Sequence, residues 1–317
     1  NRQVIAITHF PQVASLAQSH FVVTKEVEGN RTRSNIREIA KAAGQKNVGV
    51  VGYYFGSKEN LVCEILIDGA KLIEARRALG ERPLTFAVVF SYSVHNYLLR
   101  YWMAEAGIDP DRDVRLIVVP PRRMAEKLRS GEIDGFCVGA PWNALAVSEG
   151  TGEIIIYAAD FWKVGPDKVF GVTAAWAQER PQAMTAVVRA LLKAAAWCDE
   201  SQNRPTLVKL LARPDYVDAP EAVIAESLLG SPAYAAGKSG SGSLDYLIYH
   251  RYAASFPWRS HALWFLTQMR RWGQIADEKS DAWYADTAKK VYRPDLYMAA
   301  AKSLVAEGKA PADAFPA

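Results

Sequence analysis

The sequence is poor in cysteine and has no clustered metal ligands. Only three of its 317 residues are cysteines, and Cys63, Cys137 and Cys198 lie far apart in the chain. An odd number at such spacing gives neither a disulfide framework nor the paired cysteines of a zinc site. We therefore expect buried free thiols, no bound metal and no cofactor.

Long apolar runs and concentrated positive charge are also missing. No stretch reaches the roughly 18 apolar residues that a membrane span needs, so we expect no membrane span. The net charge is only +4, with 23% charged residues, and no segment gathers the basic residues. This composition permits an anionic ligand, but nucleic acid is not expected as a partner.

A nucleotide-binding loop is present only in part. Gly237-Lys238-Ser239 has the order of the end of a phosphate loop, but Pro232 stands where the earlier glycine is required. No strand is expected before it, so the phosphate-loop interpretation is rejected.

Alternating strands and helices are predicted in the middle of the chain. Apolar runs predict strands at residues 86–90, 114–119, 134–139, 154–158 and 169–172, and helices are expected at 96–106, 122–130 and near 142–149. Strands separated by such helices favour an α/β fold with a mainly parallel sheet covered by helices.

The rest of the chain is predicted to be mostly helical. Helical patterns cover residues 181–199, 205–212, 220–229, 244–254, 260–273 and 281–290. We divide the chain into an atypical N-terminal segment (1–83), an anion-binding α/β lobe (84–200) and a helical part (201–317) that returns to the first lobe.

Polar residues at the strand ends give the candidate site. Ser93, His95 and Asn96 follow the first of these strands at the start of a helix, Trp142 follows the third, and Lys168 precedes the last. Ligands of open parallel sheets bind beyond the strand ends, where helix N-termini offer free N–H groups to anions. No nucleophile, carboxylate pair or metal set accompanies these residues, so a binding protein is favoured over an enzyme.

Each candidate also has a structural interpretation, and the residues alone leave both open. His95 could cap or support its helix, Lys168 could be a solvated surface charge, and Trp142 could pack in the core.

Residues 84–300 resemble the NrtA/CmpA family of nitrate and bicarbonate solute-binding proteins, which includes the cytoplasmic nitrate sensor NasS. The similarity is carried by Phe86-Ala87-Val88-Val89-Phe90, Ser93-Val94-His95-Asn96, Leu99-Arg100-Tyr101-Trp102, Ala106-Gly107-Ile108-Asp109-Pro110-Asp111, Val119-Pro120-Pro121, Asp134-Gly135-Phe136-Cys137-Val138-Gly139, Pro141-Trp142-Asn143, Lys168-Val169, Arg271-Trp272-Gly273 and Arg293-Pro294-Asp295-Leu296-Tyr297.

The resemblance implies a type II periplasmic-binding-protein fold, with two lobes that close on the ligand. It implies that His95 contacts the anion and that Lys168 lies against nitrate or nitrite. The bicarbonate-binding members have an acidic residue at the position of Lys168 and use calcium. Ala140 departs from the glutamate of many relatives.

Two kinds of partner follow from the resemblance. An ABC permease would make the protein a periplasmic transport component, and an antiterminator-type regulator would make it a cytoplasmic sensor. The start at Asn1 shows no signal segment, and together with the free thiols this leans toward the cytoplasm.

The first 83 residues do not resemble the first lobe of that family. Residues 3–34 resemble a fragment of the RecN DNA-repair ATPases, and residues 36–77 a fragment of the TetR repressor headpiece, whose helices bind DNA. Two alternatives stay open: a mosaic sequence in the place of the first lobe, or a TetR-like DNA-binding regulator fused to an anion-sensing domain.

Overall fold

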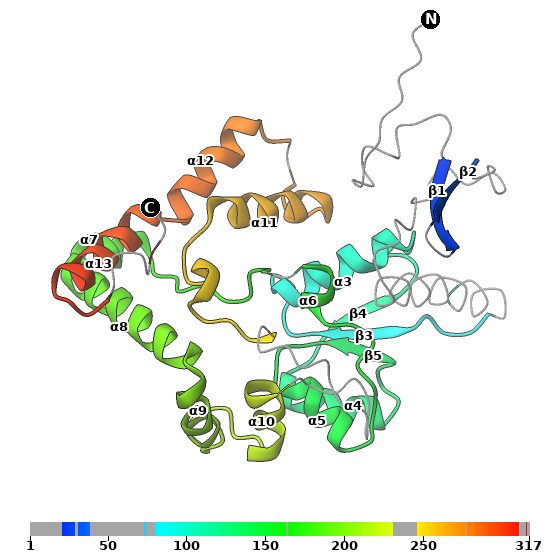
Figure 1. Ribbon diagram of the computed structural model, residues 1–317, viewed down its shortest axis with the longest axis horizontal. Helices are drawn as coiled ribbons and strands as arrows, with labels where there is room; N and C mark the ends of the chain where they lie inside the picture. Colours follow the sequence, from blue (N-terminus) through cyan, green and yellow to red (C-terminus); the bar gives the residue numbers. More distant parts are fainter. Residues whose placement is uncertain are drawn as a thin grey trace, which may run out of the picture.

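The computed structural model describes residues 21–28, 31–38, 73, 80–162, 164–230, 246–276, 278–310 and 315 (Figure 1). Most of residues 1–83 thus lies outside the described ranges, including residues 3–20 of the RecN-like fragment and nearly all of the TetR-like fragment. Strands β1 (Phe21–Glu28) and β2 (Arg31–Glu38) form an antiparallel hairpin. The TetR-like pattern predicted a helix from Ile36, and that is wrong for residues 36–38, because they pair with β1.

A three-stranded parallel sheet is the centre of the α/β part. Strands β3 (Thr85–Val88), β4 (Arg115–Val118) and β5 (Gly135–Cys137) lie in the order β4-β3-β5. The central strand pairs on both sides, and its Ala87 and Val88 are almost completely buried. The predicted strands 86–90, 114–119 and 134–139 are therefore confirmed, each somewhat shorter than expected.

Helices cover both faces of this sheet (Figure 1). Helix α3 (Val94–Glu105) packs on one face, where Leu99 and Met103 contact Val88. Helix α4 (Met124–Arg129), entered through the 3-10 turn η1 (Pro121–Arg123), packs on the other face with Ala87. Helix α5 (Trp142–Ser148) lies beside α4. Because side chains alternate along a strand, the apolar run of β3 supplies both faces of the core.

Two predicted strands are wrong. Residues 154–158 are irregular up to helix α6 (Ala158–Phe161), and residues 169–172 have no regular secondary structure. Val169 and Phe170 are 68% and 49% exposed. An apolar run becomes a strand only when a neighbouring strand completes its hydrogen bonds, and the described residues provide none there.

The second half of the described chain is helical, as predicted. Its helices are α7 (Ala174–Glu179), α8 (Pro181–Asp199), α9 (Arg204–Leu211), α10 (Glu221–Leu229), α11 (Arg259–Arg271), α12 (Asp281–Val291) and α13 (Pro294–Ala306), with 3-10 turns η2 (Ser201–Asn203) and η4 (Arg251–Ala253). Helix α13 was not predicted, and it packs along α8 through Leu192, Ala300 and Leu304.

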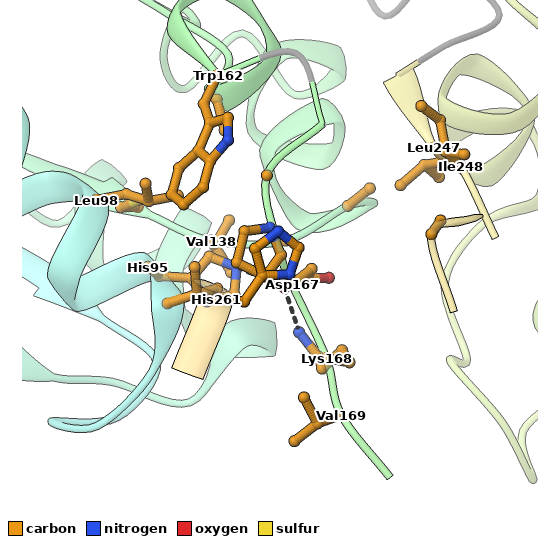
Figure 2. A pocket seen from close by; sticks show the side chains of 18 of the residues that line it. His95, Leu98, Val138, Trp162, Asp167, Lys168, Val169, Leu247, Ile248 and His261 are labelled. Carbon is orange, nitrogen blue, oxygen red and sulfur yellow. Dashed lines mark hydrogen bonds and ion pairs between the residues drawn. The ribbon is translucent and has the colours of Figure 1, made fainter. Parts of the chain in front are cut away.

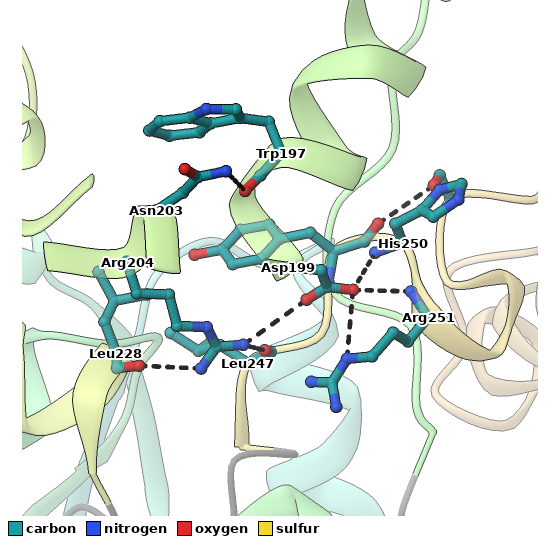
Figure 3. A network of polar contacts seen from close by, with 10 residues as sticks. Trp197, Asp199, Asn203, Arg204, Leu228, Leu247, His250 and Arg251 are labelled. Carbon is teal, nitrogen blue, oxygen red and sulfur yellow. Dashed lines mark hydrogen bonds and ion pairs between the residues drawn. The ribbon is translucent and has the colours of Figure 1, made fainter. Parts of the chain in front are cut away.

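The predicted helix at residues 244–254 is wrong for the part that the structure describes. None of residues 246–254 is α-helical: residue 246 and η4 have 3-10 geometry, and Tyr252 of η4 has a positive φ of 56°. The reason is the carboxylate of Asp199, which accepts hydrogen bonds from the backbone amides of Tyr249, His250 and Arg251 at 3.1, 2.7 and 2.7 Å (Figure 3). Those amides are therefore not available to helical carbonyl groups.

Two arginines complete the network around Asp199 (Figure 3). Arg204 and Arg251 each lie 3.6 Å from its carboxylate. Arg204 is buried and donates to the carbonyl oxygens of Leu228 and Leu247. Burial alone would raise the pKa of Asp199, but the amide hydrogen bonds outweigh burial and hold the pKa below its usual value. The network thus fixes the segment after residue 246 to the ends of α8, α9 and α10.

We expect Asp199→Ala to lower the free energy of unfolding by about 3 kcal/mol, because Arg204 would remain buried with its charge unpaired. A carboxyl group with a depressed pKa stabilises the fold above the ordinary pKa of about 4 and loses this effect as the pH falls through the folded value. Urea unfolding should therefore show a gap between wild type and variant that shrinks below pH 4. The control Asp215→Ala removes an exposed ion pair with Arg213 and should change stability by less than about 0.5 kcal/mol. Equal stabilities of Asp199→Ala and wild type would contradict the network's role.

Candidate functional site

A large cavity of about 1510 Å³ lies beyond the carboxyl ends of β3 and β5. Its walls come from α3, from the loop after β5, from residues 151–159, 162 and 164–174 on either side of and within α6, from α8 and from the segment fixed by Asp199. This is the edge of a parallel sheet at which ligands bind, and most of the lining side chains are apolar.

His95 enters this cavity from the first turn of α3 (Figure 2). Its side chain is 90% buried, and Nδ1 makes no hydrogen bond within the described part of the chain. Burial lowers the pKa of the imidazole below its usual value and Lys168 lowers it further, whereas Asp167 acts in the opposite direction. At neutral pH the ring is therefore uncharged, with one N–H to donate and one nitrogen to accept.

Gly139 lets the loop after β5 approach this imidazole. A Cβ atom at position 139 would lie 3.3 Å from His95 Nε2, which is tighter than most such contacts. The absence of a side chain at residue 139 therefore allows the loop to lie directly against the ring.

Ser93 and Asn96 build the start of α3 and do not line the cavity. The Ser93 hydroxyl accepts from the Asn96 amide at 3.2 Å, as an N-cap does. The Asn96 side chain donates to the carbonyl oxygen of Ser91 at 2.7 Å. Both residues thus position His95 in this structure.

Lys168 lies on the same cavity, on the irregular stretch after α6 (Figure 2). Its Nζ is 2.9 Å from Oδ1 of Asp167, and that same oxygen is 4.0 Å from Nε2 of His95. The side chains of Lys168 and Asp167 are 76% and 57% exposed. The structure therefore brings His95 and Lys168 to one cavity, with a carboxylate between them.

Trp142 packs away from the cavity. It contacts the apolar cluster around Leu207 and Leu228, and the Arg122 guanidinium lies 5.7 Å from its ring centre. Its neighbour Asn143 lines the cavity instead: Nδ2 donates to the Tyr246 hydroxyl at 3.0 Å, and the buried Oδ1 has no partner within the described residues.

Several cavity residues were not predicted from the sequence. Burial raises the pKa of Tyr246 to about 12, so its hydroxyl stays protonated and can donate into the cavity while it accepts from Asn143. Trp162 and His261 form an aromatic wall, with ring centres 6.2 Å apart. Asp167 is adjacent to Lys168 in sequence, but Tyr246 and His261 are remote, and no local spacing points to them.

The cavity offers hydrogen-bond donors and charge rather than a reactive group. Burial raises the pKa of the Cys137 thiol to about 12, which keeps it protonated and unreactive. Within the described ranges, no three His, Cys, Asp or Glu side chains are grouped as metal ligands. An arrangement of this kind suits binding of a small polar ligand.

Comparison with known proteins identifies the relatives of this chain. Residues 58–212 match the NMT1-like family. The nitrate/nitrite binding protein NrtA of Nostoc sp. is 34% identical over 80% of this chain and 56% of its own length. The nitrate import ATP-binding protein NrtC of Synechocystis sp. is 37% identical over 74% of this chain and 35% of its own. The bicarbonate transport ATP-binding protein CmpC of Synechococcus elongatus is 34% identical over 72% and 33%.

A solved structure agrees with these matches. The crystal structure of the periplasmic nitrate-binding protein NrtA from Synechocystis PCC 6803 has a TM-score of 0.72 and 30% sequence identity, and the match covers 81% of this chain and 65% of that one. The chain thus spans between a third and two thirds of the length of these relatives.

The fold is that of a type II periplasmic binding protein, as the sequence predicted. The chain is similar over residues 58–212 to the NMT1-like family, and over most of its length to nitrate-binding and to nitrate and bicarbonate transport proteins. The resemblance expected for residues 84–300 is thereby confirmed.

Titration of His95 tests the electrostatics of the site. We expect its NMR midpoint, without added anion, to lie below the ordinary value of about 6.5, because burial disfavours the charged ring. The resonance is assigned by its loss in His95→Gln. A midpoint at or above 6.5 would show that the ring is hydrated or that Asp167 dominates its surroundings.

Proposed function

We propose that this protein is a solute-binding receptor for a small planar oxyanion, nitrate or nitrite, and that it delivers the anion to an ABC transporter. The observation that carries the proposal is that His95 and Lys168 line one cavity at the sheet edge and share a carboxylate oxygen as neighbour. Relatives named for nitrate binding and nitrate import support it.

The donor set matches the chemistry of such an anion. Nitrate carries one negative charge and only acceptor oxygens, so it needs donors and a positive charge. Lys168 supplies an ammonium group, the neutral His95 one N–H, and the first turn of α3 the positive end of a helix dipole. The Tyr246 hydroxyl, kept protonated by burial, adds a donor from the opposite wall.

Lys168 also bears on the choice between nitrate and bicarbonate. The resemblance implies an acidic residue and a calcium ion in the bicarbonate-binding members, and here the position holds a lysine. An ammonium group neutralises the anion by itself, so the proposed site requires no cation. We therefore place nitrate and nitrite before bicarbonate.

The proposed role is binding and not catalysis. The cavity contains no activated nucleophile among its described residues, and the one cysteine there is held as a thiol. Relatives named as binding proteins point the same way.

The proposed partner is a membrane permease, and the proposed compartment is the periplasm. One relative is named as a nitrate import protein and another as a periplasmic protein. These names support neither an antiterminator partner nor a cytoplasmic location. None of the helices in the described ranges combines the length and apolar character that crossing a bilayer takes. In this proposal residues 84–200 form the anion-binding lobe, and residues 201–317 return toward the first lobe, whose place residues 1–83 would take.

The charge of Lys168 is the sharpest test. We expect Lys168→Glu to weaken nitrate binding at least about tenfold in titration calorimetry, because it replaces the attracting charge by a repelling one at the site. Nitrate, nitrite and bicarbonate should be titrated separately.

Lys209→Glu is the matched control, since Lys209 is exposed on α9 outside the cavity lining. It makes the same charge change and should leave nitrate binding within about twofold. Normal nitrate binding by Lys168→Glu, or equal losses in both variants, would remove Lys168 from the site.

A further inference from the structure

We infer that Asp167 is a built-in competitor of the ligand, whose carboxylate holds Lys168 until an external oxyanion displaces it. This inference rests on the proposed function, and it adds a residue that sets the affinity of the site. A carboxylate resembles nitrate in the features that the site would recognise, because both are planar, singly charged and acceptor-only.

The geometry places this carboxylate between the two proposed ligand contacts (Figure 2). A single oxygen, Oδ1, accepts from Lys168 Nζ at 2.9 Å and lies 4.0 Å from His95 Nε2. An external anion that bonds to both nitrogens would need the space that this oxygen occupies. Occupation by Asp167 and occupation by the ligand therefore exclude one another.

The carboxylate of Asp167 can also move away from Lys168. Its side chain is 57% exposed, and Lys168 is its one hydrogen-bonding partner among the residues that the structure describes. It lies on the irregular stretch between α6 and α7, where neither helix nor strand fixes the backbone. Release of the carboxylate into water thus breaks one exposed ion pair, with Lys168, and gives up a 4.0 Å approach to His95 Nε2 that is too long for a hydrogen bond.

The size of the effect follows from that exposure. An exposed ion pair contributes at most about 1 kcal/mol, which is a factor of about five in an equilibrium constant. A ligand that must first open the pair loses this factor in its apparent affinity, because only the open fraction of the protein can bind. Asp167 thereby lowers the apparent affinity for the anion several-fold below the value that the hydrogen-bond donors alone would give.

Nitrate titration of Asp167→Asn tests the inference. The variant keeps the size of the side chain but removes the charge that holds Lys168, so it should bind nitrate several-fold more tightly, with a gain of up to about fivefold. Glu153→Gln is the matched control, because Glu153 is an exposed carboxylate on the same cavity, whereas the hydrogen bond and ion pair of Lys168 are with Asp167. It should bind nitrate within about twofold of the wild type.

A double-variant cycle separates competition from general charge repulsion. If Asp167 acts by occupying Lys168, then Asp167→Asn should bring no gain in a Lys168→Gln background. An undiminished gain from Asp167→Asn in the Lys168→Gln background would overturn the inference, and so would an equal gain in the control Glu153→Gln. Unchanged or weaker nitrate binding by Asp167→Asn would overturn it as well. Thermal unfolding of each variant verifies that the fold is intact.

The two proposals fail in different ways. Nitrate binding by the wild type with no improvement in Asp167→Asn overturns the competitor and leaves the receptor. If neither the wild type nor Asp167→Asn binds nitrate at millimolar concentration, the proposed function is wrong. The inference that Asp167 competes with the ligand is then wrong too.

Discussion

The parallel pairing of β3 with β4 and β5 is the constraint on which the rest of the described α/β part depends. It brings the carboxyl ends of β3 and β5 to one edge, and the chain leaves both ends there. The first turn of α3, which carries His95, and the loop that contains Gly139 must therefore meet. Burial of Ala87 and Val88 between helices on both faces makes this pairing hard to alter.

A second constraint fixes the opposite wall of the cavity. Asp199 captures three successive backbone amides and two guanidinium groups, and so determines the course of the chain that carries Tyr246 and Tyr249. The hydrogen bond from Asn143 to Tyr246 then connects this wall to the loop after β5. The two walls are thus built from segments about a hundred residues apart, and neither could form the cavity alone.

The sequence predicted those elements whose cause is local. The buried run of β3 and the helical periodicity of α8 and α12 are properties of neighbouring residues, and their positions were predicted within a few residues. Residues 169–172 failed as a strand because a strand also needs a partner. The described part of the predicted helix, residues 246–254, is not α-helical because Asp199 accepts hydrogen bonds from the amides of residues 249–251. Neither the lack of a partner strand nor the hydrogen bonds to Asp199 can be derived from composition and periodicity.

The candidate site was predictable to the same extent. His95 and Lys168 follow from the rule that strand ends converge and from the family resemblance, and they do share a cavity. Ser93, Asn96 and Trp142 satisfied the same rule but serve capping and packing, since adjacency to a ligand-binding residue does not decide where a side chain points. His261 and Tyr246 reach the cavity only through tertiary structure.

The exposure of Lys168 has a kinetic meaning. Three quarters of its side chain is open to water, so an anion held there would exchange without local unfolding or opening of a packed core. Tight retention comes from slow dissociation, and the described part of the chain leaves most of the Lys168 side chain uncovered. In the proposed receptor, the time for which an anion stays bound at Lys168 would therefore depend on what covers this lysine in the bound state.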